Sequence, residues 1–238
     1  MRIVRGRADD PATDRQRTES LLSAAADGTP ALRVWAPPRQ LAFGRRDARA
    51  PGFERAAAAA SAHGFPPSER EVGGRAVAYT GETLAFAHAV PLGTHAVSDE
   101  NAPTALTGRY EHALQTVSAA LSGLGAAVTS GEPPESFCPG DHSIRVANGG
   151  KCCGIAQRVK RDVALVAGCL IVSAADADAI AAVTDPVYDA LSVPFDPAAV
   201  GSVEAAGGPT DRRVVARALE AAFTDATDDG TDQRAVGP

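Results

Sequence analysis

The sequence Asn-Gly-Gly-Lys-Cys-Cys-Gly-Ile-Ala-Gln-Arg, residues 148–158, predicts a tight turn that leads into a β-strand. Asn-Gly pairs are typical of short hairpin turns, so residues 143–147 and 151–159 are expected to pair as antiparallel strands. A lysine at the start of such a strand can direct its ammonium into a pocket and stabilise negative charge that develops on an oxygen. Gly154 would leave room for a substrate beside the strand. Taken alone, a solvent-facing lysine at a hairpin is the more economical interpretation.

The segments around this hairpin predict an α+β fold. Residues 163–172 are almost continuously apolar, as expected of a buried central strand. Upstream, strand patterns occupy residues 31–36, 40–43, 75–79 and 83–90, and the last two are expected to form a second hairpin. Because the strands cluster into hairpins, we expect a mixed, largely antiparallel sheet with flanking helices rather than a doubly wound parallel sheet.

Helices are predicted between and after these strands. Their spacing of apolar residues and their end signals place them at residues 12–26, 52–63, 104–123, 174–183, 186–192 and 210–223. The polar residues 94–103 are expected to form a loop. We expect a single catalytic domain over residues 1–224, followed by an acidic, disordered tail at 225–238.

Two more stretches contain residue types that suit a reactive site. Residues 70–77, Arg-Glu-Val-Gly-Gly-Arg-Ala-Val, place paired glycines before a strand, where backbone N–H groups can approach a ligand closely. Residues 136–142, Ser-Phe-Cys-Pro-Gly-Asp-His, place a cysteine in a sharp, accessible turn. Such a cysteine is a nucleophile where positive neighbours favour its thiolate, and His142 is a candidate base. Taken alone, a plain hairpin turn and a small buried thiol explain these stretches as well.

Charge, hydropathy and cysteine content argue against several classes of protein. The net charge of −6 argues against a nucleic-acid partner, which needs a basic face. No run of about 18 apolar residues is present, so no transmembrane helix and no membrane partner are expected. The basic N-terminus lacks the apolar stretch of a secretory signal, so a cytoplasmic location is expected. The four cysteines include no C-x-x-C pair, so no metal site is expected.

Together these stretches resemble the lipoate–protein ligase, octanoyltransferase and biotin ligase superfamily. Its lipoate branch has an R-x-x-G-G motif that opens a strand, followed by a G-x-K-x-x-G-x-A/S-Q-R motif. Here these motifs are residues 70–74 and 149–158, and the preceding Gln-Leu-Ala-Phe-Gly-Arg-Arg-Asp at 40–47 also fits. The resemblance covers roughly residues 12–195. It implies a biotin/lipoate protein ligase catalytic domain, with a mixed sheet and flanking helices.

Within the superfamily, Phe-Cys-Pro-Gly-Asp ahead of the lysine motif resembles the octanoyl-[glycine cleavage H protein]:protein N-octanoyltransferases. This resemblance implies transfer of an octanoyl or lipoyl group between carrier lysines through a cysteine thioester, with no cofactor. Cys138 would be the nucleophile, and Lys151 would bind the acyl carbonyl and steady its oxyanion. The residues implied to bind substrate are Arg70, Gly73, Gly74, Arg75, Val77, Gly154, Ile155 and Ala156. The implied partners are lipoyl-carrier proteins: the glycine cleavage H protein and the lipoyl domains of 2-oxoacid dehydrogenase E2 subunits.

An ATP-dependent lipoate–protein ligase is the alternative. Such an enzyme forms an acyl-adenylate, needs ATP and magnesium, and would use Lys151 to bind the adenylate. Against it, Arg75 stands where ligases usually carry a third glycine, and Val-Ala-Gly-Cys-Leu at 166–170 replaces His-His-Gly-Thr-Leu. Only about forty residues remain for the accessory domain of many ligases. Biotin ligase is less favoured because its Gly-Arg-Gly-Arg loop is missing. A non-catalytic relative that binds lipoylated proteins is a third hypothesis.

Overall fold

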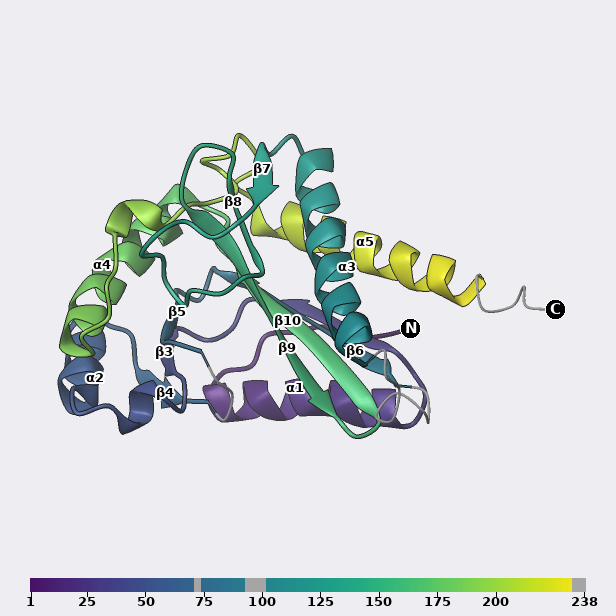
Figure 1. Cartoon of the computed structure of the whole chain (residues 1–238), viewed down its shortest axis with the longest axis horizontal. Helices are drawn as coiled ribbons and strands as arrows, with labels where there is room; N and C mark the ends of the chain where they lie inside the picture. The colour runs from purple at the N-terminus through teal and green to yellow at the C-terminus, as the bar shows by residue number, and fades with distance from the viewer. Residues whose placement is uncertain (71–73, 93–101, 233–238) are drawn as a thin grey trace.

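The structure is a computed structural model that describes residues 1–70, 74–92 and 102–232, and it contains two β-sheets (Figure 1). The larger sheet has seven strands in the order β1-β2-β6-β10-β9-β8-β7. Its strands are β1 Arg2–Ile3, β2 Ala31–Trp35, β6 Leu84–Pro91, β7 Val128–Ser130, β8 Ser143–Val146, β9 Lys151–Lys160 and β10 Val163–Leu170. Only β1 and β2 pair in parallel in this sheet; the other pairs are antiparallel.

The smaller sheet has three strands in the order β4-β3-β5. They are β3 Gln40–Phe43, β4 Pro67–Glu69 and β5 Val77–Tyr79. β3 pairs in parallel with β4 and antiparallel with β5. The two sheets therefore confirm the mixed, largely antiparallel α+β fold expected from the sequence.

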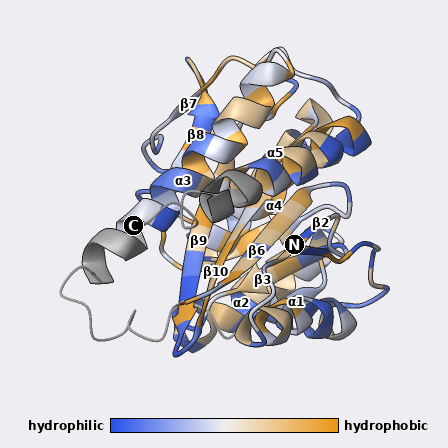
Figure 2. Ribbon diagram, turned by 90° about the vertical axis from the view of Figure 1, so that its right-hand side faces the viewer, coloured by the Kyte–Doolittle hydropathy of each residue, from blue (hydrophilic) through white to orange (hydrophobic). Residues whose placement is uncertain are grey.

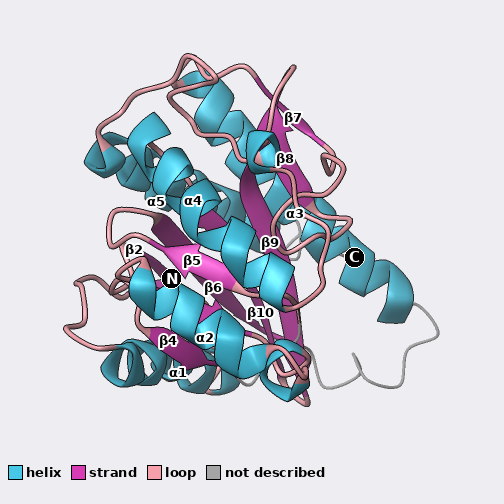
Figure 3. Ribbon diagram, turned by 90° about the vertical axis from the view of Figure 1, so that its left-hand side faces the viewer, coloured by secondary structure: helices cyan, strands magenta, loops and turns pink. Residues whose placement is uncertain are grey.

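Helices cover both faces of the larger sheet (Figures 1 and 3). They are α1 Pro11–Ala26, α2 Phe53–Ala62, α3 Ala102–Gly123, α4 Ala174–Ala190 and α5 Arg212–Asp232, with short 3₁₀ turns at Asp47–Arg49 and Pro197–Ala199. α3 and α5 pack on one face. The other face is covered by α1 and, further along, by the smaller sheet with α2 and α4. No helix in the described part of the chain combines the length and apolar character needed to cross a bilayer.

The core follows the alternation of side chains along the central strands. Figure 2 shows these strands as largely hydrophobic ribbons between the helices. Phe86 and Val166 belong to the cluster beneath α3 and α5, whereas Ala87 and Leu165 belong to the cluster beneath α1. Burial on both faces explains why residues 163–170 are almost continuously apolar. The prediction of a buried central strand there is confirmed.

The hairpin predicted for residues 75–79 and 83–90 is wrong. β5 pairs with β3 in the smaller sheet, whereas β6 lies between β2 and β10 in the larger one. The turn between β5 and β6 is closed by hydrogen bonds between the backbone and hydroxyl groups of Thr80 and Thr83. Residues 84–89 are all buried, so the backbone N–H and C=O groups of β6 need hydrogen-bond partners on both edges of the strand. β2 and β10 supply these partners in the larger sheet. The local turn signal does not reveal which sheet each arm joins.

Two helices extend beyond their predicted limits. α4 continues through Pro186 as one helix, where the sequence predicted two helices at 174–183 and 186–192. Proline removes one helical hydrogen bond, but Val183 and Val187 on either side of it are fully buried in the core, and this burial favours one continuous helix.

At the C-terminal end, α5 runs to Asp232, so residues 225–232 are helical where a disordered tail was predicted. In Figure 1 this helix points away from the sheets towards the C-terminus. Residues 233–238 and most of the loop predicted at 94–103 lie outside the described residues.

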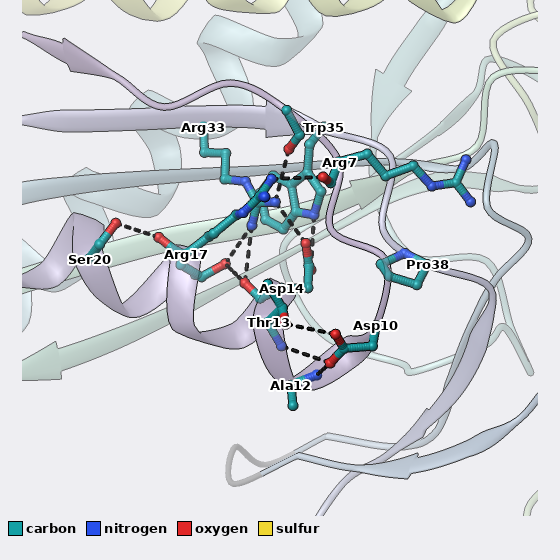
Figure 4. A network of polar contacts seen from close by, with 12 residues as sticks. Arg7, Asp10, Ala12, Thr13, Asp14, Arg17, Ser20, Arg33, Trp35 and Pro38 are labelled. Carbon is teal, nitrogen blue, oxygen red and sulfur yellow. Dashed lines mark hydrogen bonds and ion pairs between the residues drawn. The ribbon is translucent and has the colours of Figure 1, made fainter.

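A buried ion pair joins α1 to the larger sheet (Figure 4). Arg33 of β2 is fully buried and donates to the Asp14 carboxylate over 2.7 Å. The indole N–H of Trp35 donates to the other oxygen of the same carboxylate over 3.0 Å. Arg33 also lies over the Trp35 ring, 4.1 Å from its centroid. These contacts hold α1 against its face of the larger sheet.

Candidate active site

Lys151 begins β9 at an irregularity in the sheet. Arg145 lies opposite Lys151 and Ile144 lies opposite Cys153, so the extra residue on β9 forms a β-bulge. The bulge turns the lysine side chain toward the face on which Gly154 lies. A Cβ atom on Gly154 would sit only 3.1 Å from the Cε atom of Lys151. Gly154 therefore makes room for the lysine side chain itself.

The Lys151 ammonium is buried among oxygen acceptors. The residue is 1% exposed. Its Nζ donates to the backbone carbonyls of Phe137 and Cys138 over 3.1 and 2.9 Å. Both carboxylate oxygens of Glu132 lie 3.1 Å from the same nitrogen. The lysine thus connects the start of β9 to the loop that carries Cys138.

Cys138 sits in the loop between β7 and β8 with an unusual backbone conformation. Its φ is +40°, in the left-handed region that residues with a Cβ rarely adopt. Its N–H donates to the hydroxyl of Tyr188 over 2.7 Å, and that hydroxyl donates to the Ala76 carbonyl over 3.0 Å. With Lys151 on its carbonyl, the cysteine is held from both sides of its backbone.

The thiol of Cys138 lies against Arg70 and Gly74. One terminal nitrogen of the Arg70 guanidinium is 3.7 Å from the Cys138 sulfur. A Cβ atom on Gly74 would come within 3.1 Å of the same sulfur. Gly74 also has a φ of +88°, which glycine adopts readily. Both the close contact and the backbone conformation therefore favour glycine at this position. Gly73 lies outside the described residues. The cysteine loop therefore contacts both described ends of the motif at residues 70–74, Arg70 and Gly74.

Asp47 holds the turn that follows Gly74. This carboxylate is fully buried, accepts the Ala76 N–H over 2.6 Å and pairs with the Arg75 guanidinium over 2.8 Å. The Arg75 carbonyl in turn accepts a hydrogen bond from Arg70 over 2.6 Å. Arg75, which stands where ligases usually carry a third glycine, thus helps to fix the Arg70 guanidinium beside the Cys138 thiol.

Cys138 differs from the other three cysteines in its exposure. Cys152, Cys153 and Cys169 are buried, whereas Cys138 is partly exposed. Burial raises the pKa of Cys152 to about 12 and also raises the pKa values of Cys153 and Cys169. These three thiols remain protonated at neutral pH, and of the four cysteines Cys138 is the one that a reagent can reach.

Not all of the remaining predicted residues lie at this centre. Val77 belongs to the apolar cluster that Cys138 packs against. Ala156 is exposed further along β9, whereas Ile155 packs into the cluster beneath α3 and α5 on the opposite face of the sheet. The ring of His142, the candidate base, stacks on Tyr110 with centroids 3.8 Å apart. Its backbone carbonyl accepts the Ile155 N–H.

Glu132, Tyr188 and Asp47 were not recognised as site residues from the sequence. Glu132 and Tyr188 are single polar residues without a flanking motif, whereas Asp47 ends the 40–47 stretch that fits the family but was given no role there. Each of the three contacts a segment remote from it in the chain. Two hollows of about 320 and 500 Å³ lie elsewhere, one beside the β9–β10 turn and one between α3 and β7. Neither is lined by Lys151 or Cys138. The described residues contain no cluster of three or more His, Cys, Asp or Glu side chains suited to a metal ion.

The chain matches a known protein family. Residues 10–224 match the family described as the lipoyl protein ligase A/B catalytic domain. The chain belongs to this family. The lysine and cysteine segments of this lipoyl protein ligase A/B-type domain both fall inside the matched region, as do Arg70, Glu132 and Tyr188.

Individual relatives of this lipoyl protein ligase A/B-type domain include a curated protein and several solved structures. The octanoyl-[GcvH]:protein N-octanoyltransferase of Exiguobacterium sibiricum is 29% identical over 140 residues, which are 59% of this chain and 48% of that protein. The chain thus spans about half the length of this curated relative.

Solved structures show the fold. Lipoate-protein ligase A bound with ATP superposes with a TM-score of 0.71 at 19% identity, over 95% of this chain and 85% of the other. A bi-partite lipoate protein ligase of Thermoplasma acidophilum, analysed with its E2 lipoyl domain, gives 0.64 at 16% identity, over 95% and 83%. The expected similarity to lipoate ligase catalytic domains is confirmed.

Proposed function

We propose that this chain transfers an octanoyl or lipoyl group to a lysine of a lipoyl-carrier protein and holds the group on Cys138 as a thioester. One observation carries the proposal. The partly exposed thiol of Cys138 lies 3.7 Å from the Arg70 guanidinium. The backbone of Cys138 is held at a φ of +40°. Strained non-glycine residues concentrate at functional sites, and reactive cysteines are typically exposed thiols in positive surroundings.

Covalent catalysis suits this transfer because an amide is a poor acyl donor. In the first step the Cys138 thiolate attacks the carbonyl carbon of the donor amide. The C–N bond then breaks, and the released lysine amine takes up a proton from solvent. In the second step a neutral lysine amine of the acceptor attacks the thioester, the C–S bond breaks and the amine loses a proton. Two easier steps replace one difficult step, and no oxidation or reduction occurs.

Lys151 is proposed to bind the acyl carbonyl as its oxygen becomes negative. Its three N–H groups already have acceptors, so the acyl oxygen must replace one of them. Glu132 is the partner best able to leave, because its side chain is 22% exposed whereas the carbonyls belong to the cysteine loop. Gly73, Gly74, Arg75 and Val77 are proposed to line the path of the acyl chain.

The proposed substrates are acylated lipoyl-carrier proteins. Two relatives support this choice by name: one acts on the GcvH carrier, and the other was studied with an E2 lipoyl domain. We propose the glycine cleavage H protein and E2 lipoyl domains as donor and acceptor, with no cofactor in the transfer itself.

ATP-dependent ligation is the second candidate, because a structural neighbour binds ATP. In an acyl-adenylate, the phosphate is bonded directly to the acyl group. A residue that holds the acyl carbonyl therefore also lies close to the phosphate. Here the Glu132 carboxylate pairs with Lys151, and it would have to give up this ammonium to the phosphate just as to the acyl oxygen. The charges around Lys151 therefore favour neither route, and it is the thiol beside Arg70 that supports the covalent one.

Intact-mass measurement distinguishes the two routes. The protein is incubated with octanoylated carrier, and separately with octanoate and ATP. We expect the mass of one octanoyl group on Cys138 with the carrier alone, no such adduct on Cys138→Ser, and an unchanged adduct on Cys169→Ala. Turnover by an enzyme that never becomes acylated would exclude the covalent route. ATP–pyrophosphate exchange with octanoate or lipoate would instead support the ligase.

A further inference from the structure

The strained backbone of Cys138 is connected to helix α4 by one hydroxyl group. Cys138 has a φ of +40°, and Glu135 in the same loop has a φ of +52°. Left-handed conformations of this kind cost energy in residues with a Cβ and persist only where the surroundings hold them. The Tyr188 hydroxyl accepts the Cys138 N–H over 2.7 Å. It is therefore placed to compensate that cost at the residue that carries the thiol.

The same hydroxyl also donates to Ala76, the residue just before β5. Its second hydrogen bond reaches the Ala76 carbonyl over 3.0 Å, two residues after Gly74. A Cβ atom on Gly74 would lie 3.1 Å from the Cys138 sulfur, so the thiol packs directly against this glycine. One oxygen thus connects α4, the cysteine loop and the Arg70–Gly74 motif, and it sets the thiol against both Gly74 and Arg70.

The surroundings of Tyr188 suit a neutral hydroxyl that both accepts and donates. The side chain is fully buried. Burial raises the pKa of Tyr188, so its hydroxyl keeps its proton at neutral pH. The ring packs edge-on to Phe195, with centroids 5.4 Å apart. Removing only the oxygen would leave this packing in place.

We propose that Tyr188 is a positioning residue that holds Cys138 in its left-handed conformation and directs the thiol toward Arg70. This inference rests on the proposed thioester function and adds to it a residue that does not touch the substrate. Without the hydroxyl, the Cys138 N–H loses its acceptor and the loop can relax to an ordinary backbone conformation. The sulfur then moves away from the guanidinium, and both alkylation and acyl transfer become slower.

The test compares two matched Tyr→Phe variants. Tyr188→Phe removes the hydroxyl that accepts the Cys138 N–H. Tyr110→Phe removes a hydroxyl that accepts the Gln157 N–H over 2.9 Å and serves as the control. The readouts are the rate at which iodoacetamide alkylates Cys138, kcat and KM for octanoyl transfer, and the melting temperature. Alkylation is measured by peptide mass spectrometry, with Cys152, Cys153 and Cys169 reporting any unfolding.

We expect Tyr188→Phe to lower both the Cys138 alkylation rate and kcat by about 10- to 100-fold, the size that follows from a small misplacement of a reacting group. KM and the melting temperature should stay close to those of Tyr110→Phe. 4-Aminophenylalanine at position 188, which can also donate and accept, should restore most of the rate.

Equal alkylation of Cys138 in Tyr188→Phe and Tyr110→Phe would overturn the proposal. So would a failure of 4-aminophenylalanine to restore the rate in a folded protein. The thioester function can fail separately: if the wild-type protein never accepts an octanoyl group on Cys138, the alkylation comparison still tests the positioning by Tyr188.

Discussion

The ammonium of Lys151 lies 3.1 Å from both carboxylate oxygens of Glu132. The lysine is 1% exposed and the Glu132 side chain 22%, so the ion pair is mostly removed from water. An ammonium has three N–H groups, and the carbonyls of Phe137 and Cys138 take the other two. The lysine that the motif marks as functional is thus also a structural support of the cysteine loop.

Replacing Lys151 tests its place in the reaction. Lys151→Ala removes both the proposed oxyanion donor and the support of the cysteine loop. We expect octanoyl transfer to slow by about a hundredfold or more, the size seen when an oxyanion donor is lost. The chain has only one other lysine, Lys160, which is exposed at the far end of β9, so Lys160→Ala is the matched control. Near-normal transfer by Lys151→Ala would exclude the proposed role.

Removing the negative charge of Glu132 should destabilise the protein. Glu132→Gln keeps the shape and a hydrogen-bond acceptor but leaves the buried ammonium without a counter-charge. We expect the free energy of unfolding in urea to fall by about 1–3 kcal/mol. Glu82→Gln is the control, because Glu82 pairs with Arg212 and its side chain is 59% exposed. Its effect should stay within about 0.5 kcal/mol. Equal unfolding free energies for the two variants would contradict a stabilising pair at Lys151.

The four thiols should react selectively. In the native protein at neutral pH, iodoacetamide is expected to label Cys138 alone, because burial raises the pKa values of the other three. After unfolding, all four cysteines should be labelled. The native Cys138→Ser variant should take up no label. Rapid labelling of Cys169 in the native state would show that the site is more open than the structure has it.

Much of this site was predictable because its signals are local. The Asn-Gly turn before β9 and the paired glycines before β5 are short patterns with direct physical causes, and the structure brings both near the Cys-Pro-Gly loop. Tyr188 lies 50 residues beyond Cys138 in the chain, and nothing around it marks it as a partner of a cysteine. Only the packing of α4 against β5 brings the two together.

The prediction that β5 and β6 pair was wrong for a similar reason. β5 and β6 are joined by a turn that suits a hairpin, yet they belong to different sheets. The choice is made by strands far away in the sequence, β3 for one arm and β2 and β10 for the other. The bulge at Lys151 is equally invisible in the sequence, although it decides which face of the sheet the lysine side chain occupies.

His88 gives a prediction for the dependence of stability on pH. It lies on β6 against the ring of Phe223, and its Nε2 atom is buried with no hydrogen-bond partner among the described residues. Burial, with a smaller contribution from His112, lowers the pKa of His88 from 6.5 to about 4. The unfolded chain therefore binds a proton at a higher pH than the folded protein does. Stability from this residue is fully present above pH 6.5 and is lost as the pH falls toward 4.

The shift corresponds to about 3 kcal/mol across that pH range. We expect His88→Leu to lose less unfolding free energy between pH 7 and pH 4 than the wild-type protein, by up to about this amount. His63→Gln is the control, because His63 is exposed at the end of α2, and it should keep the wild-type slope. Urea titrations at a series of pH values measure the difference. If the unfolding free energies of His88→Leu and the wild-type protein change in parallel with pH, His88 takes up its proton as readily in the folded as in the unfolded state. Its ring would then not be held in an apolar environment.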